Sequence, residues 1–163
     1  MGVNRVGFAI TDDTVVRNAA CQEVIRRNFR YKCEYAIGAA DHACVDRLKV
    51  LMDNLELHEE DRVVVRPARE AAAAAAKTEG KGNDGFFCGA AIQLPDGTIV
   101  TGKNSPLLHA ASSCVLNAVK VLAGLPDDLP LISPDVINSV GMLKKNILKI
   151  KRISLALDET LIP

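Results

Sequence analysis

The sequence predicts an α/β fold in which an α/β/α sandwich follows a small helical subdomain. Residues 86–94 form an apolar run whose one polar side chain is Gln93, which is typical of a strand covered on both faces. Residues 98–101 are all β-branched, and Pro95-Asp96-Gly97 between the two runs has the residue types of a tight turn. From residue 67 onward the expected order is helix, strand, strand, helix, strand, helix, strand. Such apolar strands need helices on both faces of their sheet.

Composition places the chain among globular proteins and argues against some classes of function. Its 163 residues are 48% hydrophobic, and 20 basic residues balance 20 acidic ones. The zero net charge removes a bulk attraction to nucleic acid. No apolar run approaches the roughly 20 residues that span a bilayer, and no secretory signal is visible. Five cysteines without paired spacing indicate reduced thiols, so we expect a cytoplasmic protein without membrane contact.

Residues 1–62 are predicted to form the helical subdomain. A short strand is expected at residues 3–10, and Thr11-Asp12-Asp13 begins a helix that runs to about Ile37 and is closed by Gly38. A second helix begins at Asp41. Each helix has an apolar stripe that we expect to be buried: Cys21, Ile25, Phe29, Cys33 and Ile37 in the first, and Cys44, Leu48, Leu51, Met52 and Leu55 in the second.

Three arginines of the first helix, Arg26, Arg27 and Arg30, lie off its apolar stripe and form a basic patch. One interpretation is an ordinary solvated face. The sharper interpretation is an anion site or a contact with another domain. Nucleic-acid binding would depend on this patch alone, and no aromatic side chains are interleaved with it for stacking on bases, so nucleic acid is an unlikely partner.

Residues 63–163 are predicted to form the α/β subdomain. Arg66 precedes a proline and should be extended, so a third, alanine-rich helix begins at Pro67. Residues 78–85 read as a linker before the hairpin. Ser105 is a suitable N-cap, with Pro106 in the first position of a helix that Gly124 ends.

The last forty residues are expected to add two strands and a helix. Residues 131–133 and 152–157 are the predicted strands, and Pro134 opens the helix between them. Its apolar side should consist of Val136, Ile137, Val140, Leu143, Ile147 and Leu148. Residues 158–160 resemble the first turn of another helix. We therefore expect the chain to be a fragment, truncated at its C-terminal end.

The later part of the chain resembles the cytidine-deaminase-like fold. The run GAAIQLPDGTIVTGKNS is similar to the first hairpin of those enzymes, and His109-Ala110 falls where deaminases carry His-Ala-Glu. The resemblance does not extend to the zinc site. The position of the catalytic glutamate is Ala111, the next helix start has no Pro-Cys-x-x-Cys, and no cysteine follows Cys114. We therefore expect no metal site and no zinc deamination, because a shared fold does not transfer a function.

A second resemblance covers essentially the whole chain. The runs QEVIRRNFRYKCEYAIG, EDRVVVRPAR, FCGAAIQLPDGTIVTGKNSPLLHAASS and VLNAVKVLAGLPDD are similar to the interior of a bacterial family of uncharacterised proteins, a domain of unknown function. The resemblance implies a deaminase-like subdomain after a helical one, in proteins that are longer on both sides. It implies no established activity and no particular cofactor.

The best candidate site lies where the second strand leads into the next helix. Lys103 and backbone N–H groups at that junction could bind a phosphate, a nucleotide or a carboxylate, although no P-loop motif occurs. The alternative is that these residues shape a turn and that His109 satisfies a buried carbonyl. Nucleophilic catalysis by a Ser–His pair is a hypothesis with less support than anion binding, because no recognisable third group orients the imidazole. The candidate ligand-binding residues are Thr101, Lys103, Asn104, Ser105, His109 and Ser112.

Two functional hypotheses follow from the sequence. In the first, the chain is a domain of a larger cytoplasmic enzyme that binds a phosphorylated or nucleotide-like small molecule, an anionic partner. In the second, it is a non-catalytic structural or oligomerisation module with a degenerate deaminase-like fold. We expect the full-length protein to be a homo-oligomer in either case. The substrate and the reaction do not follow from the sequence.

Overall fold

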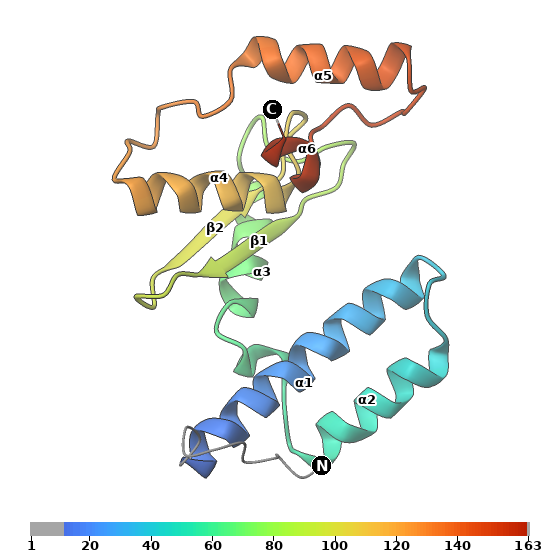
Figure 1. Cartoon of the computed structure of the whole chain (residues 1–163). Coiled ribbons are helices and arrows are strands. Elements are labelled where there is room, and N and C mark those ends of the chain that lie inside the picture. The colour runs from blue at the N-terminus through green and yellow to red at the C-terminus, as the bar shows by residue number, and fades with distance from the viewer. Residues whose placement is uncertain (1–11, 163) are drawn as a thin grey trace. The chain divides into compact units, whose positions relative to one another are not determined.

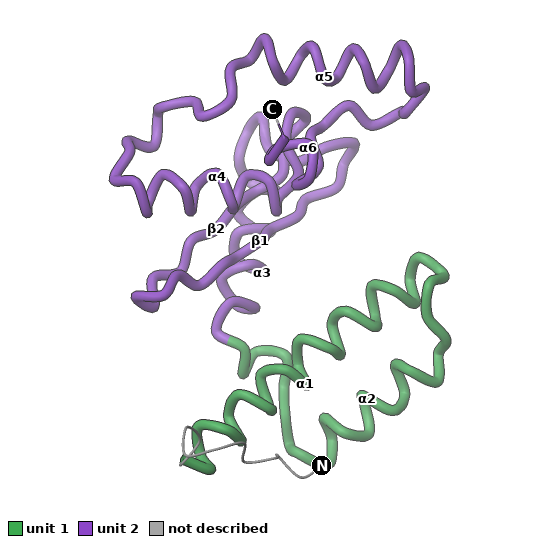
Figure 2. Tube along the Cα trace, in the orientation of Figure 1, with its two compact units in different colours: residues 1–62 green, residues 63–163 purple. Residues whose placement is uncertain are grey.

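The computed structural model describes residues 12–162, and the strand expected at residues 3–10 lies outside this range. The chain divides into two compact units whose boundary falls between Arg62 and Val63, as Figure 2 shows. Each unit has its own secondary structure.

The first unit is helical. Helix α1 (Asp13–Ala36) and helix α2 (His42–Asn54) pack against each other, and a short 3-10 helix, η1 (Glu59–Asp61), follows (Figure 1). The side chain of Asp12 caps α1 by accepting hydrogen bonds from the N–H groups of Thr14 and Val15. Gly38 follows α1 with a φ of 76°, a conformation that glycine adopts without strain. The predicted bounds of α1 and the predicted start of α2 are confirmed to within a residue or two.

The predicted stripes of this unit are only partly buried. Ile25 of α1 and Leu48 and Met52 of α2 are buried, but Phe29 is 69% exposed and Ile37 is 79% exposed. A helix that packs against one partner buries a narrow strip of its surface, and the ends of the stripe extend beyond that strip. Asn28 is buried where the stripe pattern predicted Phe29, so the stripe was wrong at that turn.

The second unit is built on a hairpin. Strand β1 (Gly89–Gln93) pairs antiparallel with β2 (Ile99–Lys103), with Ala91 opposite Thr101. In the turn, the N–H of Gly97 donates to the carbonyl of Leu94, and the carboxylate of Asp96 accepts from the N–H of Thr98. The predicted hairpin is therefore confirmed, although β1 begins three residues later than expected.

Two glycines show that helices cover opposite faces of this hairpin. A Cβ on Gly89 would lie 2.0 Å from the carbonyl oxygen of Ala68 in helix α3 (Val65–Ala75). A Cβ on Gly102 would lie 2.2 Å from the backbone nitrogen of Cys114 in helix α4 (Ala110–Ala123). Gly102 pairs with Ala90, the neighbour of Gly89, so the two glycines face opposite sides of the sheet. The sheet therefore lies between α3 and α4 (Figure 1).

The observed unit is α/β, with fewer strands than the sequence predicted. Among residues 12–162 the named strands are β1 and β2. Residues 131–133 form no strand, and residues 152–157 contribute a single parallel bridge between Leu155 and Leu108. Helix α5 (Pro134–Asn146) lies between those segments, and α6 (Leu157–Leu161) follows them. The mixed α/β class is confirmed, whereas the cytidine-deaminase-like sandwich stays a prediction.

Two predicted helix starts were wrong. Helix α3 begins at Val65, so Arg66 is helical; Pro67 occupies the third helical position, where the missing N–H costs no intrahelical hydrogen bond. Helix α4 begins at Ala110 with His109 as N-cap. The hydroxyl of Ser105 instead accepts from the N–H groups of Leu107 and Leu108, which closes a separate turn before the helix.

Candidate functional site

A small pocket of about 180 Å³ lies in the second unit beside the start of α4. Three segments that are distant in the sequence form it: the loop before β1, the junction between β2 and α4, and the segment between α5 and α6. The lining residues are Asn83, Asp84, Phe86, Cys88, Asn104, Ser105, His109, Ala110, Arg152 and Ser154.

Half of the predicted ligand-binding residues lie at this pocket. Asn104, Ser105 and His109 line it, whereas Thr101, Lys103 and Ser112 do not. Lys103 pairs with Gly89 and so belongs to the sheet face that α3 covers. The carbonyl of Thr101 accepts a hydrogen bond from the amide of Asn117, within the contact between β2 and α4.

Asn104 holds the loop before β1 in place. It is only 7% exposed, and its side-chain amide donates to the carbonyl of Phe86 at 2.9 Å while its oxygen accepts from the N–H of Cys88 at 2.8 Å. Its backbone carbonyl also accepts from the N–H of Gly82. These contacts use the polar atoms of Asn104 inside the protein, so this residue shapes the pocket wall.

The start of α4 is tied to Leu155. The carbonyl of Leu155 accepts from the N–H of His109 and from the hydroxyl of Ser112, both at 3.0 Å. Ser112 is fully buried, which explains why it lies behind the pocket and not in its lining. The alternative prediction for His109 thus holds for its backbone N–H, which satisfies a buried carbonyl. The exposed imidazole of His109 belongs to the pocket lining.

Arg152 is the cationic residue among the pocket-lining residues that the sequence did not predict. Its guanidinium carbon lies 6.0 Å from the centre of the Phe86 ring. Within residues 12–162 the guanidinium makes no hydrogen bond or ion pair. The sequence predicts a strand at residues 152–157, and nothing in it places Arg152 beside Phe86. Only the folded chain brings them together.

A partly buried ion pair lies next to Ser154 of the pocket lining. Lys144 of α5 is 5% exposed, and its ammonium donates to the carboxylate of Glu159 at 2.7 Å and to the carbonyl of Ser154 at 2.9 Å. Burial by itself would raise the pKa of Glu159. The hydrogen bonds from Lys144 and from the N–H of Ala156, with the nearby Lys144 charge, outweigh that effect and lower this pKa.

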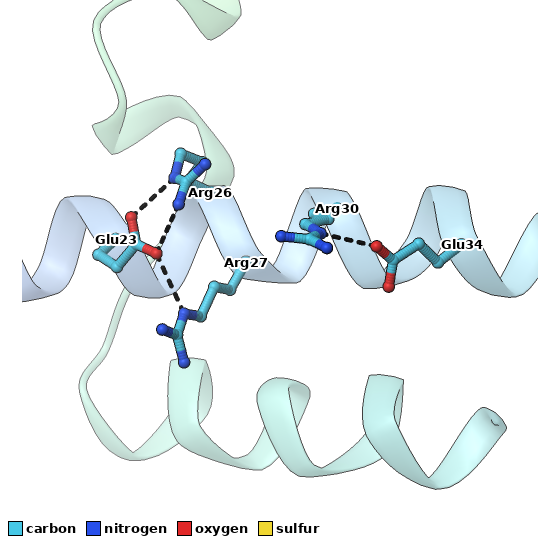
Figure 3. Close-up of polar contacts among 5 residues, drawn as sticks. All are labelled: Glu23, Arg26, Arg27, Arg30 and Glu34. Carbon is cyan, nitrogen blue, oxygen red and sulfur yellow. Dashed lines mark hydrogen bonds and ion pairs between the residues drawn. The ribbon is translucent and has the colours of Figure 1, made fainter. Parts of the chain in front are cut away.

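The arginines of the basic patch in the first unit differ from Arg152, because each of them is paired with a glutamate of the same helix. Figure 3 shows Glu23 bound to both Arg26 and Arg27, and Glu34 bound to Arg30 at 2.6 Å. The hydrogen bonds from Arg26 and Arg27 lower the pKa of Glu23 to about 2. Partners three and four residues apart on α1 pair these charges, which favours the solvated-face interpretation over an anion site.

The described residues offer no site for a metal ion. Across residues 12–162, no three His, Cys, Asp or Glu side chains are grouped so as to hold one. All five cysteines are free thiols, and burial raises the pKa of Cys114. No helix within the same range has both the length and the apolarity to cross a membrane.

These features define an α/β unit with a small pocket, carried on one chain with a separate helical unit. Comparison with known families identifies it further. Residues 1–56 match the N-terminal domain of unknown function DUF1846, and residues 60–163 match its C-terminal domain. The chain therefore belongs to the DUF1846 family of uncharacterised proteins.

Bacterial relatives support the same assignment. A UPF0371 protein of Clostridium botulinum (strain Langeland / NCTC 10281 / Type F) is 45% identical over 163 residues, and one of Clostridioides difficile (strain 630) is 45% identical over 162 residues. Both alignments cover 99% of this chain and 32% of the relative. The chain thus spans about a third of the length of these relatives.

Proposed function

We propose that the pocket binds the anionic group, a phosphate or a carboxylate, of a small phosphorylated or nucleotide-like molecule, as part of a larger cytoplasmic enzyme. The observation that carries this proposal is Arg152. An arginine at a pocket wall without a carboxylate partner suits bidentate binding of an anion. The start of α4 adds to it, because first-turn N–H groups have no partner inside a helix and Ala110 lines the pocket.

The size of the pocket limits what enters it. Pockets that hold drug-sized ligands occupy about 300–1,000 Å³. A volume of about 180 Å³ suits an anionic group with a few attached atoms. A nucleotide-like ligand would therefore place its phosphate here and the rest of the molecule outside. Asp84 also lines the pocket and opposes a strongly charged anion, so we expect affinity to fall as ligand charge increases beyond that of one phosphate.

A thermal-shift screen tests the proposal. Purified protein is titrated with inorganic phosphate, sugar phosphates, nucleotides and small carboxylates, because a ligand that binds only the folded state raises the melting temperature. We expect one class to stabilise the protein. Arg152→Met and His109→Ala should abolish that shift while both variants stay folded.

Lys103→Ala is the matched control, because it removes a positive charge near the same strand end without altering the pocket lining. It should keep the ligand response. Loss of binding in Lys103→Ala with retention in Arg152→Met would move the site to the other sheet face. No response to any class in wild-type protein would overturn the proposal.

A second candidate function is assembly with another copy of this chain, and exposed apolar side chains favour it. Helix α4 presents Val119, Val121 and Leu122. Helix α5 presents Met142 and Leu143, and Ile147 follows directly after it; each of these side chains is more than a third exposed. Clusters of exposed apolar residues often mark interfaces. Light scattering with size-exclusion chromatography checks this: a homo-oligomer that Leu122→Lys or Ile147→Lys dissociates would support it, and a monomer at high concentration would not.

A further inference from the structure

The segment of residues 152–160, here called the C-terminal strap, forms one wall of the pocket. On its α4 side, the N–H of Leu155 donates to the carbonyl of Leu107 at 2.8 Å, and the carbonyl of Leu155 accepts from His109 and Ser112. Leu155 is 1% exposed, so these contacts are buried. They fix the position of the strap backbone at Leu155 relative to the start of α4.

On its other side, the strap is held by a clamp of two charged residues. Lys144 donates to the Ser154 carbonyl and to the Glu159 carboxylate, and the same carboxylate oxygen accepts from the N–H of Ala156 at 2.7 Å. The clamp therefore holds both neighbours of Leu155. Gly141 and Lys144 are the buried residues of α5, so this polar contact carries much of the attachment of that helix.

We infer that Lys144 and Glu159 are positioning residues that fix the strap so that Arg152 stands at the pocket wall. Arg152 precedes Ser154 by two residues, and within residues 12–162 its guanidinium makes no hydrogen bond or ion pair and lies 6.0 Å from the centre of the Phe86 ring. Its position therefore depends on the backbone of the strap. The expected effect on ligand affinity rests on the proposed function, whereas the placement of Arg152 does not.

A cysteine in the pocket lining allows a test that needs no ligand. Cys88 is exposed and lines the pocket with Arg152. The rates of alkylation of Cys88 by iodoacetate, which is negatively charged, and by iodoacetamide, which is neutral, are measured by mass spectrometry. A nearby guanidinium favours the charged reagent. We expect Arg152→Met to lower the ratio of the two rates by roughly threefold.

Glu159→Ala tests the clamp. Removal of a negative charge would by itself raise the ratio at Cys88, whereas a displaced Arg152 lowers it. The inference expects a fall toward the Arg152→Met value, and substantial recovery in Glu159→Gln, which keeps an oxygen acceptor. Asp158→Ala is the matched control, because it removes an exposed carboxylate of the same helix. A ratio that rises or stays constant in Glu159→Ala would overturn the inference.

Two further readouts separate this inference from the proposed function. Cys114 is buried, so its protection from both reagents reports that a variant is folded. If Glu159→Ala exposes Cys114, the test uses Lys144→Met in place of Glu159→Ala, with Lys145→Met as its control. Titration with inorganic phosphate is then compared: a fall in the Cys88 ratio without any phosphate binding by wild-type protein supports the clamp and contradicts the proposed function. A Cys88 ratio that stays constant in the clamp variant, together with phosphate binding by wild-type protein, contradicts the clamp and supports the proposed function.

Discussion

Helices α4 and α5 belong to the same unit and have similar amphipathic sequences, yet they are held in different ways. Helix α4 buries four small residues, Ala110, Ser112, Cys114 and Ala118, and Gly102 lets its backbone approach the sheet directly. Helix α5 buries Gly141 and Lys144 and leaves Met142 and Leu143 exposed. An apolar pattern thus predicts a helix, but close backbone approach and polar contacts decide which face is buried.

The strongest test of this comparison replaces one glycine by alanine at each of the two contacts, Gly102 beneath α4 and Gly141 within α5. In Gly102→Ala the new methyl group would meet the backbone of Cys114 and Ala110 at 2.2 and 2.5 Å, so α4 must move off the sheet. We expect a loss of about 3 kcal/mol or more in the free energy of unfolding.

Gly141→Ala is the matched control in α5. Its new methyl group would lie 3.6 Å from Ile153, an ordinary contact, and alanine is the better helix former. We expect a gain of up to about 1 kcal/mol. Chemical denaturation of both variants checks the pair, and equal losses would mean that α5 is seated as closely as α4.

Removal of the Lys144 ammonium should have the next largest effect. Lys144→Met leaves the carbonyl of Ser154 without this donor and Glu159 without its cation, both at least partly buried. Because Glu159 keeps some contact with solvent, we expect a loss of about 2 kcal/mol, less than for a fully buried pair. Lys145→Met, an exposed neighbour, should change the free energy of unfolding by less than about 0.5 kcal/mol. Comparable effects of the two substitutions would show that the clamp adds nothing.

Ser112→Ala tests a buried hydrogen bond of α4. Its hydroxyl donates to the carbonyl of Leu155, which keeps a second donor in the N–H of His109. Because no acceptor is left unpaired, we expect a loss of only about 1 kcal/mol, measured by denaturant unfolding. A loss as large as that of Gly102→Ala would indicate that this hydroxyl, and not steric fit, positions α4.

The smallest expected effect is a pH dependence at Glu159. Its pKa in the folded state lies below the ordinary value of 4.5, so folding is favoured above about pH 4.5 and this contribution is lost as the pH falls through the lowered pKa. Denaturation of wild type and Glu159→Gln at pH 3 to 7 should give a difference in stability that shrinks below pH 4.5. A difference that is constant across this range would contradict the assigned shift.

The sequence predicted the elements whose signals are local. Four such signals encode their own geometry and were predicted: the Pro95-Asp96-Gly97 turn, the start of α1 at Asp12 and Asp13, the end of α4 at Gly124 and the start of α5 at Pro134. The side chain of Ser133 caps α5, although residues 131–133 were expected to form a strand. The strand expected at residues 152–157 was wrong, because an apolar run does not determine whether it pairs as a strand or makes one bridge.

The candidate site was predictable only where the chain is continuous. Asn104, Ser105 and His109 follow one another at the junction of β2 and α4, so local reasoning found them. Arg152 and Asn83 reach the same pocket through contacts across many residues, which composition and periodicity do not describe. Ser112 lies only three residues after His109, but its buried acceptor, the carbonyl of Leu155, lies in a distant segment.

The parallel bridge between Leu108 and Leu155 also has a consequence for the order in which the protein is made. A ribosome completes the hairpin and α4 long before it adds Arg152 and Ser154. Until Leu155 arrives, the N–H of His109 and the hydroxyl of Ser112 lack the acceptor that they share in the finished protein. A nascent chain therefore carries only part of the pocket, and any ligand of this site would meet a complete binding surface only after synthesis has passed the strap.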